Sequence, residues 1–112
     1  MNTFIRTNHS KVFASVLNTF FKNPGSWIFL TPKAFDKLIN NCLFFEELEK
    51  NSHSFITELN TNEHIEIEIF VQTSTLLYNT VYWIHTIRIN DTFYKYRVPL
   101  PTNIIFIDSA DA

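Results

Sequence analysis

Histidines, cysteine and carboxylates are the residues of this sequence that could hold a metal ion. Four histidines occur, at positions 9, 53, 64 and 85, without the i, i+4 helical pair or the clustered Cys/His spacing of a zinc site. The triplet His64-Ile65-Glu66 matches the first half of a zinc-deaminase signature, but the Pro-Cys-x-x-Cys half is absent. The sequence therefore predicts no metal site and no cofactor.

Four polar side chains, Glu58, His64, Glu66 and Glu68, fall on one face of a predicted β-hairpin. Carboxylates and an imidazole gathered in this way could hold a hard cation or contact a basic partner. Strand alternation alone produces the same grouping on a solvated sheet face. We favour the solvated face and keep a functional acidic face as the alternative.

Residues for nucleophilic, phosphate or acid-base chemistry are few. Cys42 is the single cysteine and falls on the apolar stripe of a predicted helix, which is typical of a core thiol. The single glycine, Gly25, cannot build the usual glycine-rich loop around a phosphate. His85, on a predicted buried strand face beside Tyr96, could act as an acid or base or satisfy a hydrogen bond, and it has no carboxylate partner. We therefore expect a protein without enzymatic activity.

Aromatic and cationic residues alternate on one face of a second predicted hairpin. This predicted binding face contains Tyr82, Arg88, Phe93, Lys95 and Arg97. Such interleaving is typical of surfaces that bind proteins or single-stranded nucleic acids. The other interpretation is charge compensation, with the cations lying opposite glutamates of the first hairpin.

Two helices are expected to come first in the chain. Apolar residues recur at helical spacing between Ser10, a suitable cap, and the Asn-Pro-Gly break at residues 23–25. A short apolar run then leads to Thr31-Pro32, an N-cap followed by proline at the first helical position. The next apolar stripe predicts a helix that ends near Lys50.

From Ser54 onward the hydrophobic period changes to two, which predicts strands with one buried face. A hairpin with a three-residue loop at residues 60–62 would pair Thr57 with Ile65 and Phe55 with Ile67.

A second hairpin is predicted over residues 81–90 and 92–98, with Asn90-Asp91 as its turn. Strict alternation along it places Trp83 and His85 on the buried face and Tyr82 on the reverse face. A last apolar run, residues 104–107, lacks alternation and suits a covered strand.

The composition is that of an ordinary globular protein. Apolar residues make up 46% and charged residues 18% of the 112 residues. Together with the element pattern, this predicts a single α+β domain over residues 1–112. We expect an antiparallel sheet of four to six strands, with both N-terminal helices packed on one face.

Net charge and residue usage limit the classes of function that the sequence allows. A net charge of −2 argues against a protein that mainly grips phosphate backbones. The single cysteine and the lack of a membrane-length apolar run predict a cytoplasmic protein without a membrane partner. Abundant Phe, Ile and Asn, whose codons are AT-rich, are typical of phage and mobile-element genes.

The favoured function is that of a small, non-catalytic protein-binding module. An inhibitor, an immunity protein or a regulator from a phage or mobile element would fit, with a protein partner or a second copy of the chain bound. The alternatives are a single-stranded nucleic-acid-binding protein that uses the aromatic and basic face, and an enzyme of an unrecognised type.

Overall fold

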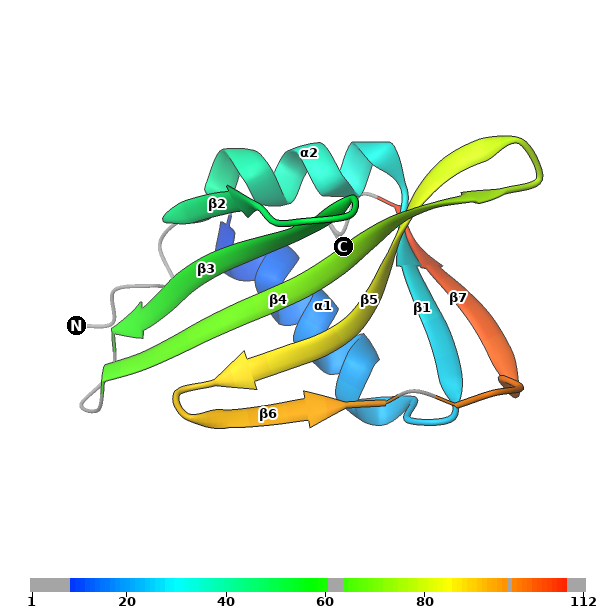
Figure 1. Ribbon diagram of the computed structural model, residues 1–112. Helices are drawn as coiled ribbons and strands as arrows, with labels where there is room; N and C mark the ends of the chain where they lie inside the picture. Colours follow the sequence, from blue (N-terminus) through cyan, green and yellow to red (C-terminus); the bar gives the residue numbers. More distant parts are fainter. Residues whose placement is uncertain (1–8, 61–63, 97, 109–112) are drawn as a thin grey trace.

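The computed structural model describes residues 9–60, 64–96 and 98–108 of the chain, with two helices and seven strands (Figure 1). The helices are α1 (His9–Lys22) and α2 (Pro32–Asn41). The strands are β1 (Ser26–Leu30), β2 (Phe44–Glu47), β3 (Ser52–Asn60), β4 (His64–Leu76), β5 (Asn79–Ile89), β6 (Thr92–Lys95) and β7 (Asn103–Ile107).

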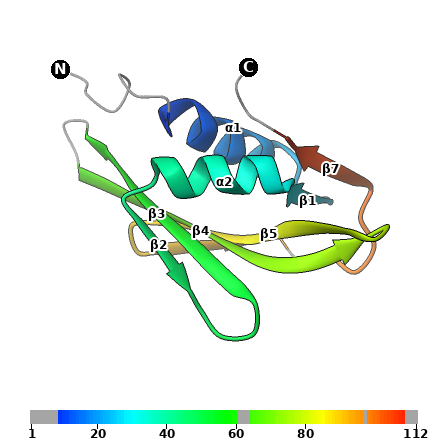
Figure 2. The same cartoon turned by 90° about the horizontal axis from the view of Figure 1, so that it is seen from above.

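The strands form one mixed, mostly antiparallel sheet in the order β2-β3-β4-β5-β1-β7, and β6 pairs with the C-terminal half of β5. Only the β1–β7 pairing among the described strands is parallel. Both helices lie on the same side of the sheet (Figure 2). The predicted α+β fold is therefore confirmed, and the sheet has more strands than the four to six expected.

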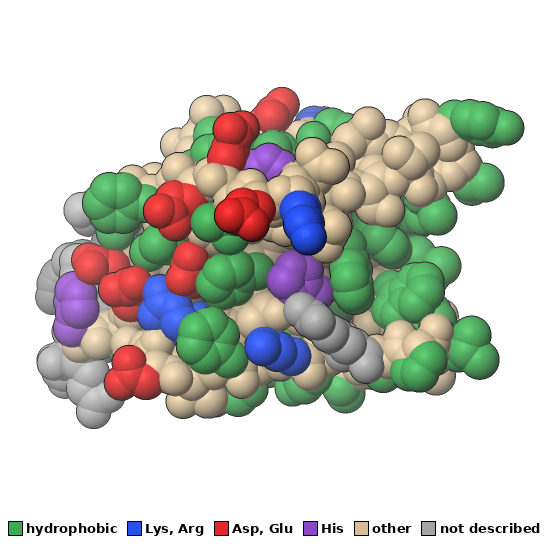
Figure 3. Space-filling view, viewed as in Figure 1, with side chains coloured by type: hydrophobic (Ala, Val, Ile, Leu, Met, Phe, Trp, Pro, Cys, Tyr) green, Lys and Arg blue, Asp and Glu red, His purple; other side chains and the backbone are tan. Residues whose placement is uncertain are grey.

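The opposite side of the sheet has no described helix or strand over it, and we call it the open face (Figures 2 and 3). The cross-strand register decides which side chains it displays, because residues directly opposite each other in a sheet share a face. Each step of the register therefore bears on the candidate site.

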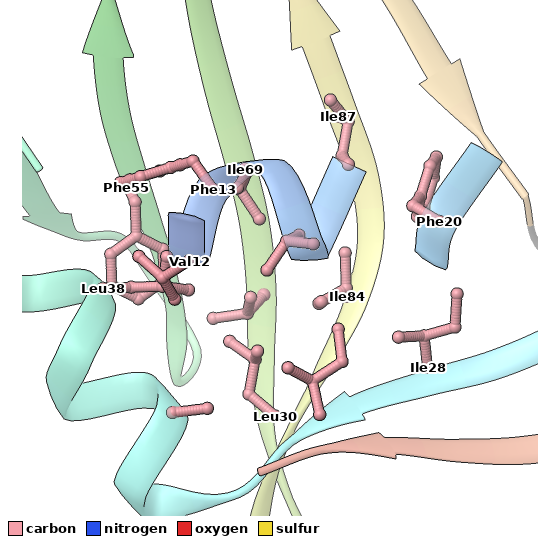
Figure 4. Close-up of a cluster of buried hydrophobic side chains, with 14 of the residues drawn as sticks. Val12, Phe13, Phe20, Ile28, Leu30, Leu38, Phe55, Ile69, Ile84 and Ile87 are labelled. Atoms are coloured by element: carbon pink, nitrogen blue, oxygen red, sulfur yellow. The ribbon is translucent and has the colours of Figure 1, made fainter. Parts of the chain in front are cut away.

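The core fills the space between the helices and the sheet (Figure 4). Both helices contribute an apolar stripe, as their sequence periodicity predicts, and the sheet contributes alternate residues of β3, β4, β5 and β1. The largest fully buried side chains include Phe13, Phe20, Leu38, Phe55, Ile67, Ile69, Ile84, Ile87, Ile28 and Leu30.

Helix α2 begins as predicted but ends early. The Thr31 hydroxyl accepts a hydrogen bond from the Ala34 amide at 3.3 Å, and Pro32 occupies the first turn. The helix stops at Asn41 because Cys42 is extended, and the following residues pair with β3 as strand β2. The expected helix end near Lys50 is wrong, since a four-residue strand is too short to show a period of two.

The β3–β4 hairpin has the predicted faces in a shifted register. Phe55 lies opposite Ile69 and Thr57 opposite Ile67, so each partner is two residues further along β4 than expected. An even shift leaves every side chain on its predicted face. Phe55, Thr57 and Ile67 are accordingly buried.

A β-bulge interrupts the pairing between β4 and β5. Phe70 lies opposite Thr86, whereas the next residue, Val71, lies opposite Ile84. His85 is therefore an extra residue on β5, and the alternation of faces along the strand changes at this point.

The bulge overturns part of the predicted second hairpin. Ile87, beyond the bulge, is buried under the helices as expected and lies opposite Tyr94. Before the bulge the faces are exchanged, so that Trp83 lies on the open face and Tyr82 on the helix face. The prediction that Trp83 would be buried with the helices and Tyr82 would lie on the reverse face is wrong, because it assumed uninterrupted alternation.

Candidate functional site

Tyr82 does not belong to the surface on which the sequence placed it. Its ring stacks on that of Phe35 from α2, with centroids 3.7 Å apart and planes 8° from parallel. Desolvation raises the pKa of the Tyr82 phenol above its ordinary value, and the charge of Asp36 adds to the rise. Tyr82 is therefore a packing residue between α2 and the sheet.

Three of the other predicted residues, Arg88, Phe93 and Lys95, share the open face, while Arg97 lies outside the described residues. Phe93 is 53% exposed, and the Lys95 ammonium lies 6.0 Å from its ring centroid, at the outer limit of a cation-π contact. The Phe93 ring also lies 6.2 Å from that of Phe70. Phe93 and Lys95 thus form an accessible aromatic and cationic pair.

Arg88 is fixed between two glutamates of the neighbouring strand. Its Nε donates to Glu68 Oε1 at 2.9 Å and its Nη2 to Glu66 Oε2 at 2.7 Å, while Nη1 donates to the Asn90 carbonyl. The side chain is only 16% exposed. Desolvation opposes the charge of Arg88, but the hydrogen bonds and charges of the glutamates outweigh it and raise the pKa. This geometry supports the charge-compensation interpretation for Arg88.

The described acidic residues of β3 and β4 are divided between two ion-pair groups. Glu66 and Glu68 bind Arg88, whereas the Glu58 carboxylate lies 3.0 Å from Nε2 of the exposed His64. No set of three or more His, Cys, Asp and Glu residues in the described part of the chain is placed to hold a metal ion.

His85 occupies the bulge, and its contacts differ from those expected. Nδ1 lies 2.8 Å from the hydroxyl of Thr86, and the imidazole lies 5.4 Å from the ring of Trp83. The expected neighbour, Tyr96, instead stacks on Phe20 of α1 at 4.7 Å. The β5–β6 ladder keeps the predicted register but ends at Thr86 and Lys95, so it does not include the expected pair of His85 with Tyr96.

An aromatic recess, which the sequence did not predict, opens between β1, β4 and β5. Its described lining residues are Trp27, Phe29, Ser74 and Trp83, and its volume is about 150 Å³. Figure 3 shows apolar side chains gathered on this end of the open face, away from the charged groups over β3 and β4. The inverted face of Trp83 and the undetected strand β1 hid the recess from sequence reasoning.

Two contacts fix the walls of the aromatic recess. The indole Nε1 of Trp27 donates to the carbonyl of Val98 at 2.9 Å. The ring of Phe29 stacks against that of Phe106 on β7, with centroids 5.7 Å apart. A recess with positioned aromatic walls is ready to accept an apolar group.

Comparisons with known proteins add no identity. No protein family, curated protein or solved structure matches this chain. Neither described helix has the length and apolar character needed to cross a bilayer.

The tip of the β4–β5 hairpin displays two apolar side chains in an unusual turn. Leu77 and Tyr78 both have positive φ, 51° and 70°, a conformation that hairpin turns usually assign to Asn or Gly. Both are strongly exposed, and the tip projects beyond the rest of the sheet (Figure 1). A hollow of about 410 Å³ beside this tip is lined by Thr31, Pro32, Leu76, Leu77, Asn79, Thr80, Val81 and Phe106, none of which is charged.

Cys42 caps the C-terminal end of α2 and packs partly against the core, as the sequence predicts for a structural thiol. Its Sγ donates to the carbonyl of Ile39 at 3.5 Å. Desolvation raises the pKa of the thiol above its ordinary value, against a smaller lowering by a backbone hydrogen bond. The neutral thiol is therefore the form that the fold favours.

We expect Cys42 in the native protein to react with iodoacetamide roughly tenfold more slowly than in the unfolded chain at neutral pH, since the thiolate is the reactive form. The fold raises the pKa of the thiol, so the neutral thiol contributes fully to stability at any pH below its pKa in the unfolded chain. This contribution is lost as the pH rises through the pKa of the thiol in the folded protein. Mass spectrometry of timed reactions measures the rate. Equal rates with and without denaturant would show that the native fold does not protect the thiol from the reagent.

Proposed function

We propose that this protein is a non-catalytic binding module that docks a protein partner on its open face. The aromatic recess formed by Trp27, Phe29 and Trp83 carries this proposal. Aromatic side chains around a recess are typical of the few residues that supply most of the binding energy at protein interfaces. Phe93, further along the same face, offers a second exposed aromatic contact.

The size of the recess favours a protein over a metabolite. A volume of about 150 Å³ is well below the several hundred Å³ of typical small-molecule pockets. It suits one apolar side chain projecting from a partner. The open sheet around it then provides the flat contact area that a protein interface needs.

The chemistry of the recess also favours binding over catalysis. Its described lining is two tryptophans, one phenylalanine and the Ser74 hydroxyl, without a titratable group. Arg88 of the open face is engaged within the chain, since two glutamates neutralise it, whereas Lys95 stays accessible. That neutralisation also weakens the attraction of this face for phosphate. A module of this kind acts by covering part of its partner, as cytoplasmic inhibitors, immunity proteins and phage or mobile-element regulators do.

Filling the recess tests this function. We expect Ser74→Trp to reduce capture of the partner by at least about tenfold, because 1.4 kcal/mol of lost contact is sufficient for that change. Phe93→Ser should weaken capture less, since Phe93 lies outside the recess. The tagged protein is incubated with nuclease-treated lysate of its source cells, and retained proteins are quantified by mass spectrometry.

Phe44→Ser is the matched control, because Phe44 is 66% exposed but lies on β2, far along the strand order from the recess. It should leave capture unchanged. All three variants should unfold within a few degrees of the wild-type protein. Undiminished capture by a folded Ser74→Trp protein would refute the recess as the docking site.

A further inference from the structure

The two ends of the sheet differ in how well they resist pairing with another strand. β7 ends the strand order on one side, and no described strand pairs with its outer edge. Its five residues, Asn103–Ile107, include no charge and no proline, and its pairing with β1 is regular. Natural proteins usually protect a free edge with charge, proline, a bulge or a very short strand. β7 therefore has few of the protections that an edge strand normally carries.

β2, at the other end of the sheet, is protected. It has four residues, two of which, Glu46 and Glu47, are exposed glutamates. Charge on a short edge strand opposes the approach of another strand. The contrast marks β7 as the edge that is suited to pairing.

The hydrogen bonds of β7 show which of its backbone groups point outward. The carbonyl of Ile107 accepts a hydrogen bond from the Thr31 amide at 3.1 Å, so Ile107 directs its backbone groups toward the side of β1. Because successive residues of a strand direct these groups to opposite sides, Ile105 also faces β1. The N–H and C=O groups of Ile104 and Phe106 then point away from the sheet.

We propose that β7 pairs antiparallel with β7 of a second copy of this chain, across a two-fold axis at Ile105. In that register Ile104 lies opposite Phe106 of the partner subunit, and the same pairing recurs on the other side of the axis. The outward groups of these residues would form four main-chain hydrogen bonds. The two sheets would become one continuous sheet.

The side chains of β7 fit this arrangement. Ile104 and Phe106 are 47% and 48% exposed on the open face. The register places the isoleucine of each copy opposite the phenylalanine of the other. Aromatic and β-branched side chains opposite each other form a favourable cross-strand pair. The pairing would cover apolar area that the single chain leaves in water.

Charge distribution favours a second copy as the occupant. The protein carries a net charge of −2, and the glutamates of the open face and of β2 lie on strands β2 to β4. Joining two copies at β7 places these acidic strands at opposite ends of the joint sheet, so like charges stay apart. The uncharged edge offers nothing that would select a charged strand of another protein.

Sedimentation of the purified chain over a concentration series reaching the millimolar range tests the dimer. We expect a monomer–dimer equilibrium that Ile104→Lys weakens at least about tenfold, since a lysine on an edge strand opposes pairing. Phe44→Lys places the same charge on β2 and should leave the equilibrium unchanged. A wild-type protein that stays monomeric throughout the series would overturn the proposal, as would a dimer that a folded Ile104→Lys protein retains.

Disulfide formation tests the register itself. In a Cys42→Ser background, Ile105→Cys puts two thiols opposite each other in a non-hydrogen-bonded pair, with Cα atoms about 4.5 Å apart, within the range of a disulfide. Ile104→Cys puts the two thiols at positions that are offset by two residues along the paired strands, so their Cα atoms lie too far apart for a disulfide. Mild oxidation should therefore link the Ile105→Cys chains and leave the Ile104→Cys chains unlinked.

Either of two results would refute this register. One is a disulfide between Ile104→Cys chains but not between Ile105→Cys chains; the other is no disulfide in either variant at a concentration at which the wild type is dimeric. The result is separate from the test of the proposed function, because Ser74 and Phe93 lie outside β7. The sedimentation experiment also contains no partner protein. A monomer that still captures its partner through the recess would overturn the dimer alone.

Discussion

Replacing Tyr82 with serine should lower the free energy of unfolding by about 3 kcal/mol. The substitution removes the ring that stacks on Phe35 at 3.7 Å and leaves a cavity between α2 and β5. The value lies at the low end for truncation of an aromatic residue, because the Tyr82 ring is partly rather than fully buried. Equilibrium unfolding in urea, followed by circular dichroism, measures the loss.

Two substitutions control for this effect. Tyr82→Phe keeps the stacked ring and should change the free energy of unfolding by less than about 1 kcal/mol. Phe93→Ser removes a ring of similar size from the open face and should cost about as little. If Tyr82→Ser were as silent as Phe93→Ser, both rings would lie on the open face, so the faces of β5 would follow strict alternation and the bulge at His85 would be wrong.

The features that were predicted correctly are those with a local physical cause. Thr31 and Pro32 mark the start of α2 because a capping hydroxyl followed by proline has few other uses. The buried face of the β3–β4 hairpin was also predicted, since Phe55 and Ile67 can leave water only on one side of the sheet. Its exact pairing was not, because a shift of two residues buries the same set of side chains.

The bulge at His85 explains the largest error. A single extra residue exchanges the faces of all the β5 side chains that precede it, and the local sequence contains no signal that predicts the bulge. The bulged segment contains no glycine, and His85 has no positive φ. Only the long-range pairing of β4 with β5 reveals the change.

The turn at Leu77 and Tyr78 was missed for a related reason. Turn prediction relies on Asn, Gly and Asp at positions of positive φ, and these two residues are apolar. Non-glycine residues pay roughly 1–2 kcal/mol each for this conformation. The hairpin pairing around the tip compensates for that cost, and it is not visible in the turn sequence itself.

The candidate site was predicted in part. The charge compensation of Arg88 by Glu66 and Glu68 was one of two interpretations, and the structure places these three side chains in contact. The aromatic recess could not be anticipated, because it brings together residues of three strands. Two of its walls, Phe29 and Trp83, meet only through the β1–β5 pairing.

Replacing Arg88 with methionine should lower the free energy of unfolding by roughly 3 kcal/mol, because it leaves a largely buried carboxylate without its partner. Glu68 is only 9% exposed and accepts a hydrogen bond from Arg88 Nε at 2.9 Å. Methionine retains much of the aliphatic volume of arginine, so packing changes contribute little. Urea unfolding of the single variant measures the cost.

The double variant Arg88→Met/Glu68→Leu separates an ion-pair role from a binding role. Removing both charges removes the unpaired carboxylate, so the double variant should recover more than half of the lost stability. Glu68→Leu alone should cost less than Arg88→Met, because Arg88 keeps Glu66 and the Asn90 carbonyl as partners. Stability unchanged by Arg88→Met, together with reduced capture of a partner, would instead identify Arg88 as a contact residue. Because the guanidinium already donates to three oxygen atoms of its own chain, we expect the first result.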